Sequence, residues 1–335
     1  MSPAGASGRE IGPGSVGAVV TREVRVSVLD PEGLYELDEQ QQPQPGELEA
    51  PVLLHALGGF VDAGSAGRLA AEHLLGALPH RVLARFDVDQ LYDYRARRPV
   101  MTFVEDHWES YDTPRLELSL VEDSSGTSFL MLTGPEPDVQ WERFAAAVRR
   151  LVEVYGVRLS IGVHAIPMAV PHTRPVGVTA HATRPELVSD HDPWVGRIQV
   201  PGHIAGLLEL RLGEWGHDAA GFAVHVPHYL AQTEYPAAAV RLVEAVATTG
   251  GLDLPTEALA EAGEEVRAAV EAQVSEQPEV AAVVATLEEQ YDAFVGARGR
   301  SLLARESSLP TADELGAELE RFLAEENERK GRADG

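Results

Sequence analysis

Short apolar runs alternate with helical patterns along most of the chain. Apolar or alternating runs of strand length occur at 23–29, 52–57, 81–86, 116–122, 128–133, 157–163, 176–180 and 222–226. Apolar residues at helical spacing occur between several of these runs, at 62–78, 138–151, 203–215 and 235–248. Strands that alternate with helices predict a layered α/β fold, with a mostly parallel sheet covered by helices on both faces.

The stretch Pro51–Leu75 shows this alternation most clearly. An apolar run ends at Gly58-Gly59, and a helical pattern follows from Asp62, whose carboxylate can accept hydrogen bonds from first-turn N–H groups. A glycine turn before a helix can also bind phosphate. However, the spacing matches neither GxGxxG nor the P-loop, and Asp62 would repel a phosphate. The sequence therefore favours a tight strand-to-helix turn.

The two ends of the chain differ in composition from its middle. Residues 1–20 are rich in Gly, Ser, Pro and Ala and predict a disordered tail, and strand patterns stop near residue 254. Beyond it, apolar stripes lie among Glu, Ala and Arg, which predicts three amphipathic helices. The stripes comprise Leu259, Val266, Val270 and Val274; Leu287, Tyr291, Phe294 and Val295; and Leu315, Leu319, Phe322 and Leu323. We expect an α/β domain at 21–253 and a helical element at 254–330.

Composition narrows the classes of function. The 335 residues carry 27 basic and 53 acidic side chains, a formal net charge of −26, which argues against a nucleic-acid or anionic-membrane partner. There is no cysteine, and so no disulfide, thiolate nucleophile or cysteine zinc site. The N-terminal segment does not have the pattern of a signal peptide, and no apolar run is long enough to span a bilayer. We therefore expect a cytoplasmic protein.

The richest cluster of candidate chemistry is the segment Pro171–Pro175, PHTRP, which comes after a predicted strand. Arg174 offers a planar fork of donors and His172 a titratable nitrogen, so the pair could bind an anion. Alternatively, Arg174 pairs with a nearby carboxylate, and the prolines only stiffen the loop. Asp62 and Asp87 also follow predicted strands, and parallel strands would bring both to the sheet edge where this loop lies.

A second cluster, His225-Val-Pro-His228-Tyr229, follows the strand at 222–226. Two histidines at this spacing could bind a metal, but no third ligand stands at motif spacing, so we expect a packed loop with His228 as a candidate ligand contact. A nucleophile elbow of the G-x-S-x-G type is absent, because GSAG at 64–67 has the wrong spacing. The residues therefore indicate neither a catalytic group, a metal site nor a cofactor.

Several motifs together resemble the proteasome assembly chaperone 2 family, in its actinobacterial branch. They are GGFVDAG (58–64), the segment from Asp87 through Arg97-Arg98-Pro99, GPEPDVQWERF (134–144), PHTRP (171–175) and VPHYLAQTEYP (226–236). The resemblance runs from about residue 23 into the C-terminal helices. It implies a three-layer α/β/α sandwich, similar to the nucleoside phosphorylase and hydrolase class.

The resemblance also implies a role in assembly. Eukaryotic relatives pair with a partner and guide assembly of the proteasome α ring, and some relatives engage the ring through a hydrophobic-Tyr-x tail. This chain ends in RADG at 332–335, without that tail. We expect a non-enzymatic, protein-binding homo-oligomer, a trimer by analogy with the phosphorylase class, whose partners are proteasome subunits or another protein. The alternative is a phosphorylase- or hydrolase-like enzyme, or a small-molecule sensor, with an anionic or nucleoside-like ligand beside Asp62, Asp87, His172 and Arg174.

Overall fold

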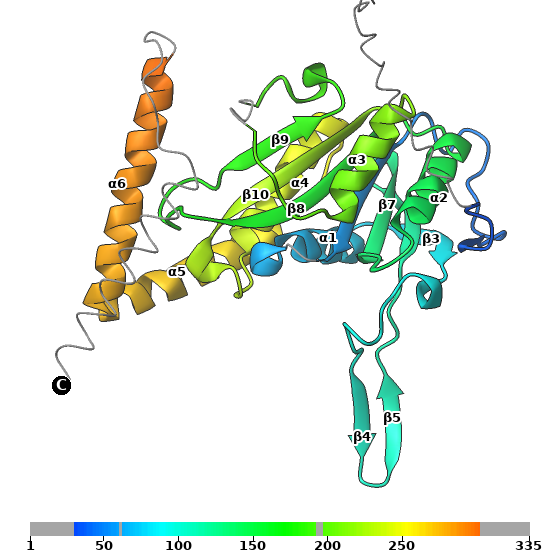
Figure 1. The fold of residues 1–335 in the computed structure, drawn as a ribbon, viewed down its shortest axis with the longest axis horizontal. Coiled ribbons are helices and arrows are strands. Elements are labelled where there is room, and N and C mark those ends of the chain that lie inside the picture. The colour runs from blue at the N-terminus through cyan, green and yellow to red at the C-terminus, as the bar shows by residue number, and fades with distance from the viewer. Residues whose placement is uncertain (1–29, 60–61, 192–196, 302–335) are drawn as a thin grey trace, which may run out of the picture.

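A computed structural model describes residues 30–59, 62–191 and 197–301 of the chain, without the side chains of 296–301. Its main sheet has eight strands in the order β1-β3-β6-β7-β2-β8-β10-β9 (Figure 1). These are β1 (Tyr35–Leu37), β2 (Val52–Gly58), β3 (His80–Phe86), β6 (Glu117–Glu122), β7 (Ser128–Pro135), β8 (Leu159–Met168), β9 (Val178–Ala182) and β10 (Ala219–Pro227). Strands β3, β7, β2, β8 and β10 run in one direction, and β1, β6 and β9 run against them. The sheet is thus mixed: most of its described strands share one direction, as predicted, with parallel pairs at its centre and antiparallel pairs toward both edges. The predicted strand at 23–29 lies outside the described residues.

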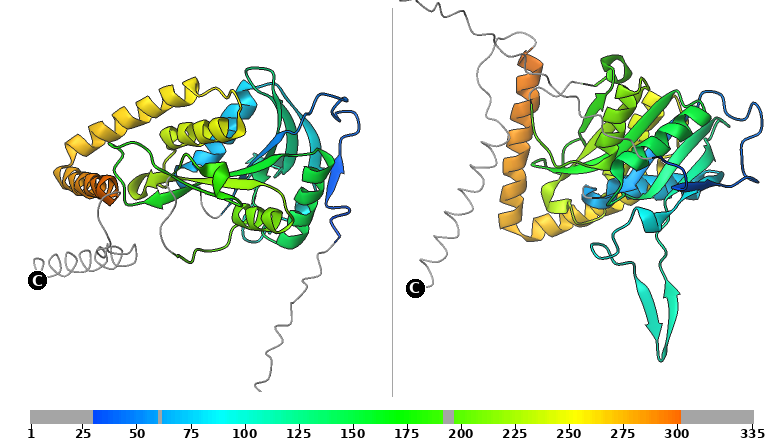
Figure 2. Two further views of the ribbon diagram at one scale, coloured as in Figure 1. Left: turned by 90° about the horizontal axis from the view of Figure 1, so that it is seen from above. Right: turned by 45° about the vertical axis from the view of Figure 1, so that its right-hand side comes forward.

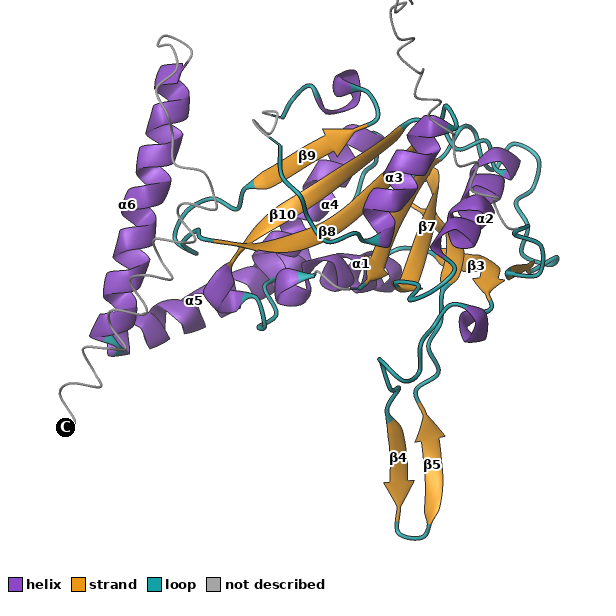
Figure 3. Ribbon diagram, in the orientation of Figure 1, coloured by secondary structure: helices purple, strands orange, loops and turns teal. Residues whose placement is uncertain are grey.

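Helices cover both faces of this sheet and give three layers (Figures 2 and 3). They are α1 (Ala66–Ala77), α2 (Trp141–Val154), α3 (Ile204–Glu214) and α4 (Pro236–Gly250). α1 and α4 lie on one face, and α2 and α3 lie on the other. The sequence of β2 is apolar except for His55 because both of its faces are buried: Leu54 packs with α1 and α4, and Leu53 with α2 and α3. The predicted α/β/α architecture is therefore confirmed.

The turn after β2 separates the capping residue from the helix that it caps. A 3-10 turn at 63–65 follows Asp62 and ends in a left-handed residue, so α1 begins at Ala66 and not directly after Asp62. The Asp62 carboxylate nevertheless accepts hydrogen bonds from the N–H groups of Gly67 at 2.8 Å and Arg68 at 3.0 Å. The capping contact is therefore present as predicted, but the start of the helix is corrected.

The sequence patterns do not predict the hairpin of β4 (Met101–Val104) and β5 (His107–Tyr111), which forms a separate two-stranded sheet. The hairpin projects from the body of the molecule (Figure 1). Nearly all of its residues are exposed, and so no alternation of apolar and polar residues marks its strands. Arg97 fastens the segment that leads into it, through hydrogen bonds to the carbonyl oxygens of Gly58 and Glu136.

Two long helices follow the sheet, as the first two C-terminal stripes predict. α5 (Glu257–Glu276) packs on α4, and α6 (Pro278–Ser301) stands apart from the sheet (Figure 1). The third stripe, at 315–323, lies outside the described residues. None of the described helices is both long and apolar enough to cross a membrane.

Candidate functional site

The carboxyl ends of β2, β7, β8 and β10 form one edge of the sheet, where open α/β folds place their ligand sites. Asp62 follows β2, His172 and Arg174 follow β8, and His228 follows β10. Asp87 follows β3. Because β6 and β7 lie between β3 and β2, these two strands are separated by roughly 14 Å at ~4.8 Å per strand. The predicted site residues are therefore spread along the edge and do not form one cluster.

The glycine turn after β2 makes room for a buried carboxylate. Oε1 of Glu136 accepts a hydrogen bond from the N–H of Ile204, the first residue of α3, at 2.6 Å, and Glu136 is only 8% exposed. A Cβ on Gly59 would lie 1.8 Å from Oε2 of Glu136, which is shorter than van der Waals contact allows. A Cβ on Gly58 would meet only the Gly134 carbonyl oxygen, at 3.8 Å. Position 59 thus requires glycine because of Glu136.

Two of the helix N-termini at this edge, those of α1 and α3, already carry carboxylates of the protein itself. Asp62 accepts from the first turn of α1, and Glu136 accepts from the first residue of α3. Burial raises the pKa of Asp62, while the N–H groups of Gly67 and Arg68 counteract that rise. An anionic ligand needs free N–H groups at a helix N-terminus and would here meet negative charge. The arrangement disfavours an anion site at both helices.

His172 is a buried part of its loop. Its backbone N–H donates to the Tyr229 hydroxyl at 2.8 Å, and its Nδ1 lies 2.7 Å from the same oxygen. Its Nε2 is buried without a hydrogen-bond partner in the part of the chain that the structure describes. Burial lowers the pKa of His172, so the ring is neutral at pH 7. Tyr229 thus ties the loop after β8 to the end of β10.

Arg174 pairs with α6 and not with Asp62 or Asp87. Its Nε and Nη2 donate to the two carboxylate oxygens of Asp292 at 2.8 and 2.6 Å, and its Nη1 lies 3.2 Å from Glu288. The expected convergence of Arg174 with Asp62 and Asp87 at the sheet edge is therefore corrected. The physical reason is that α6 returns to this loop and offers two carboxylates nearer than either aspartate, a return that no local sequence pattern reveals.

His228 and His225 contact different residues. His228 is exposed and lies edge-on to Tyr229, with ring centroids 5.4 Å apart. Nε2 of His225 lies 2.8 Å from the Thr179 hydroxyl. Within 30–59, 62–191 and 197–301, no group of three or more His, Asp or Glu residues is arranged to hold a metal ion.

No sequence motif singles out a set of histidines between the sheet and α3, which we name the histidine layer: His55, His164, His181 and His203. The ring centroids of His164 and His203 lie 4.9 Å apart, and those of His164 and His181 lie 6.2 Å apart. His203 caps α3, because its Nδ1 accepts a hydrogen bond from the N–H of Gly206 at 3.3 Å. His55 and His164 interrupt apolar strand runs, which is the signal that could have revealed the layer.

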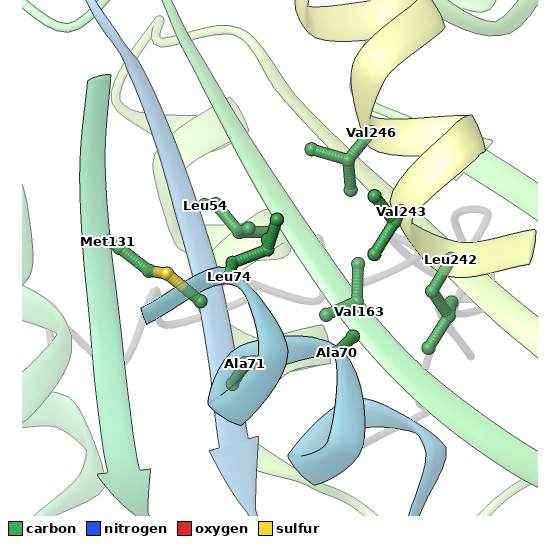
Figure 4. A pocket seen from close by; sticks show the side chains of 10 residues that line it. Leu54, Ala70, Ala71, Leu74, Met131, Val163, Leu242, Val243 and Val246 are labelled. Atoms are coloured by element: carbon green, nitrogen blue, oxygen red, sulfur yellow. The ribbon is translucent and has the colours of Figure 1, made fainter. Parts of the chain in front are cut away.

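Two cavities of the described structure are small. One lies between the sheet, α1 and α4, is lined by apolar side chains such as Leu54 and Leu74, and has about 210 Å³ of open space, its mouth included (Figure 4). The other, of about 200 Å³, lies beside Gly58, Asp62 and His164. Ligand pockets typically measure about 300–1,000 Å³. Both cavities are therefore smaller than a typical ligand pocket.

The chain is similar to several known proteins. The model of the PAC2 family matches residues 56–274. A Mycobacterium tuberculosis protein of unknown function is 50% identical over 88% of this chain and 96% of its own, with a TM-score of 0.77. A Corynebacterium glutamicum protein of unknown function is 41% identical over 78% of this chain and 98% of its own, with a TM-score of 0.75.

A third relative carries a functional name. It is a Mycobacterium tuberculosis proteasome-assembly chaperone homologue, 25% identical over 70% of this chain and 99% of its own, with a TM-score of 0.64. No protein of curated function matches the sequence.

Proposed function

We propose that this chain, which belongs to the PAC2 family, is a non-enzymatic, protein-binding homo-oligomer of the proteasome-assembly-chaperone type. Family membership and the likeness to a Mycobacterium tuberculosis proteasome-assembly chaperone homologue support the proposal. The proposed partners are proteasome subunits, bound in the cytoplasm.

A contrast between two surfaces carries the proposal. The carboxyl edge of the sheet is filled by the protein's own contacts, with Asp62 on α1, Glu136 on α3 and Arg174 on α6. The β4–β5 hairpin instead exposes Phe103 at 54% and Trp108 at 63%, with ring centroids 5.0 Å apart. Large exposed aromatic side chains are typical of protein interfaces, so binding of a protein is favoured over binding of a small substrate.

The hairpin also needs contact with another protein surface to be stable. A two-stranded hairpin is at best marginally stable in water, and the described residues place no further strand beside this one. Val100, Met101 and Tyr111 add to its exposed apolar side chains. We infer that a second copy of the chain covers the hairpin, which is the basis for the proposed homo-oligomer.

Purified components test the proposed partner. The full-length protein is mixed with purified α subunits of an actinobacterial proteasome, and masses are measured by size-exclusion chromatography with multi-angle light scattering. We expect a complex that is heavier than either component alone. Elution of both components at their separate masses would contradict the proposed partner. A rise in melting temperature with inorganic phosphate or a nucleoside would support the enzyme or sensor alternative instead.

A further inference from the structure

The histidine layer has features that stability alone does not explain. A Cβ on Gly162 would lie 2.5 Å from Cε1 of His55, and a Cβ on Gly221 would lie 2.2 Å from Cε1 of His181, so glycines in the strands make room for both rings. Yet Nδ1 of His55 and Oγ of Ser160 are buried without a hydrogen-bond partner among the described residues. Unpaired buried polar groups cost stability, and an apolar side chain at position 55 would avoid that cost.

Titratable and charged groups face the layer from several elements packed around it, and His225 of β10 lies on the same face of the sheet, with its Nε2 2.8 Å from the Thr179 hydroxyl. α3 packs on β2, β8 and β10 and beside α2. The groups are His55 from β2, His164 from β8, His181 from β9, Glu136 from the loop after β7, and His203 and Glu209 from the N-cap and body of α3. At the contact between α3 and α2, Arg211 is paired with Glu142 at 2.6 Å and with Glu214 at 2.7 Å.

Protonation of His203 would remove a contact that holds the start of α3. His203 caps α3 only while its Nδ1 keeps a free lone pair, because the N–H of Gly206 donates to that atom. Burial lowers the pKa of His55 to about 4 and that of His164 to about 3, and the nearby His203 adds to both shifts. Burial also lowers the pKa of His203, although Glu136 opposes that shift. The rings of His55, His164 and His203 are therefore neutral at pH 7 while α3 covers them.

We propose that the histidine layer is a proton-operated release for α3, in which proton uptake by His55, His164 and His203 detaches this helix before the rest of the fold opens. Once α3 is detached, the rings reach water and regain an ordinary pKa of about 6.5. The open state then binds more protons than the closed state, so opening becomes easier as the pH falls below about 6.5. Each histidine that takes up a proton adds up to a tenfold rise in the opening constant per pH unit.

Amide hydrogen exchange of the full-length protein, read by mass spectrometry between about pH 4.5 and pH 7, tests the release. Rates are corrected for the intrinsic pH dependence of exchange. We expect the logarithm of the opening constant of α3 to rise as the pH falls, with a slope that approaches the value for uptake of three protons. We expect a clearly smaller slope for α1 and α4, which lie on the opposite face of the sheet.

Substitutions separate this proposal from general acid unfolding. His203→Asn keeps an acceptor at the cap of α3 but cannot be protonated near neutral pH, and should lower the α3 slope by about one proton. His164→Gln should do the same while it retains the capping side chain of His203. The control is His73→Gln on α1, whose Nε2 contacts the Pro255 carbonyl oxygen, and it should leave the α3 slope unchanged. Equal slopes for α3 and α1 in the wild type, or a slope that His203→Asn does not alter, would overturn the proposal.

Discussion

At the scale of single residues, small residues decide where large polar ones can lie. Gly59 allows the Glu136 carboxylate to reach the start of α3, and Gly162 allows the His55 ring to lie against β8. Neither glycine has a positive φ, so each position requires glycine for space and not for backbone freedom. Substitutions that add a single methyl group should therefore have different effects at neighbouring glycines.

Gly59→Ala should lower the free energy of unfolding by roughly 1–3 kcal/mol, because the added Cβ displaces Glu136 from the Ile204 N–H and leaves buried polar groups unpaired. Unfolding in urea measures the change. Gly58→Ala is the matched control, since its Cβ has room, and should alter the free energy by less than about 1 kcal/mol. If both substitutions destabilised the protein equally, the turn would need glycine for another reason.

Tyr229→Phe should lower the free energy of unfolding by about 1–2 kcal/mol, because the hydroxyl is hydrogen-bonded to both the backbone N–H and Nδ1 of His172. Tyr92→Phe is the control, because Tyr92 contacts Arg97 through its ring and the substitution retains that ring. Thermal or urea unfolding of the two variants gives the comparison. An unchanged midpoint for Tyr229→Phe would mean that this contact contributes nothing.

At the scale of elements, polar contacts hold α6 to the loop after β8. Thr173 and Arg174 contact Glu288, Arg174 also contacts Asp292, and the Tyr291 hydroxyl donates to a carbonyl oxygen of the same loop at 3.3 Å. The hydrogen bond between Arg174 and Asp292 raises the pKa of the guanidinium and lowers that of the carboxylate. The carboxylates of Glu288 and Asp292 both reach solvent. Removing Arg174 therefore leaves them hydrated and should loosen α6 without unfolding the core.

Arg174→Ala should therefore speed amide exchange in α6 while changing the melting temperature of the whole protein little. Arg184→Ala is the matched control, because Arg184 forms the same forked pair with Asp218 away from α6. High salt should produce part of the same loosening in the wild type, since it screens exposed ion pairs. Exchange in α6 at the wild-type rate would show that Arg174 does not hold the helix. Protection of only the wild type by phosphate would identify Arg174 as an anion site.

At the scale of the whole molecule, charge and shape act in opposite directions on association. The net charge of −26 makes copies of the chain repel one another. The hairpin that projects from the body carries apolar side chains suited to association (Figure 1). Salt screens the repulsion and leaves the apolar contact intact, so association should strengthen as ionic strength rises.

The purified chain should give a mass well above 36.1 kDa in light scattering at micromolar concentration. Replacing Phe103 and Trp108 together with serine should shift the mass toward the monomer, because both side chains would otherwise be buried between copies. Val154→Ser is the control, since Val154 is equally exposed but lies on α2 away from the hairpin. A single species of 36.1 kDa for the wild type would contradict the oligomer.

Local patterns were sufficient to predict most of the layered fold. β2, α2 and α3 lie close to the predicted runs at 52–57, 138–151 and 203–215, because burial on both faces gives a nearly continuous apolar run and burial on one face gives a periodic one. The contact between Asp62 and the first turn of α1 was predictable for the same reason, since its partners are five and six residues away. The family motifs are likewise local, and the match of the PAC2 family model over 56–274 confirms what they indicate.

Contacts between distant segments could not be read from the sequence. The partner of Arg174 lies 118 residues further on, in α6, and Gly59 is required by a carboxylate at position 136. The histidine layer combines strands and a helix whose order across the sheet is set by topology, and the hairpin has no buried face to give its residues a period. Periodicity reports whether a side chain is buried, but which side chains meet depends on how the strands and helices are ordered in space, and that ordering exists only in the folded chain.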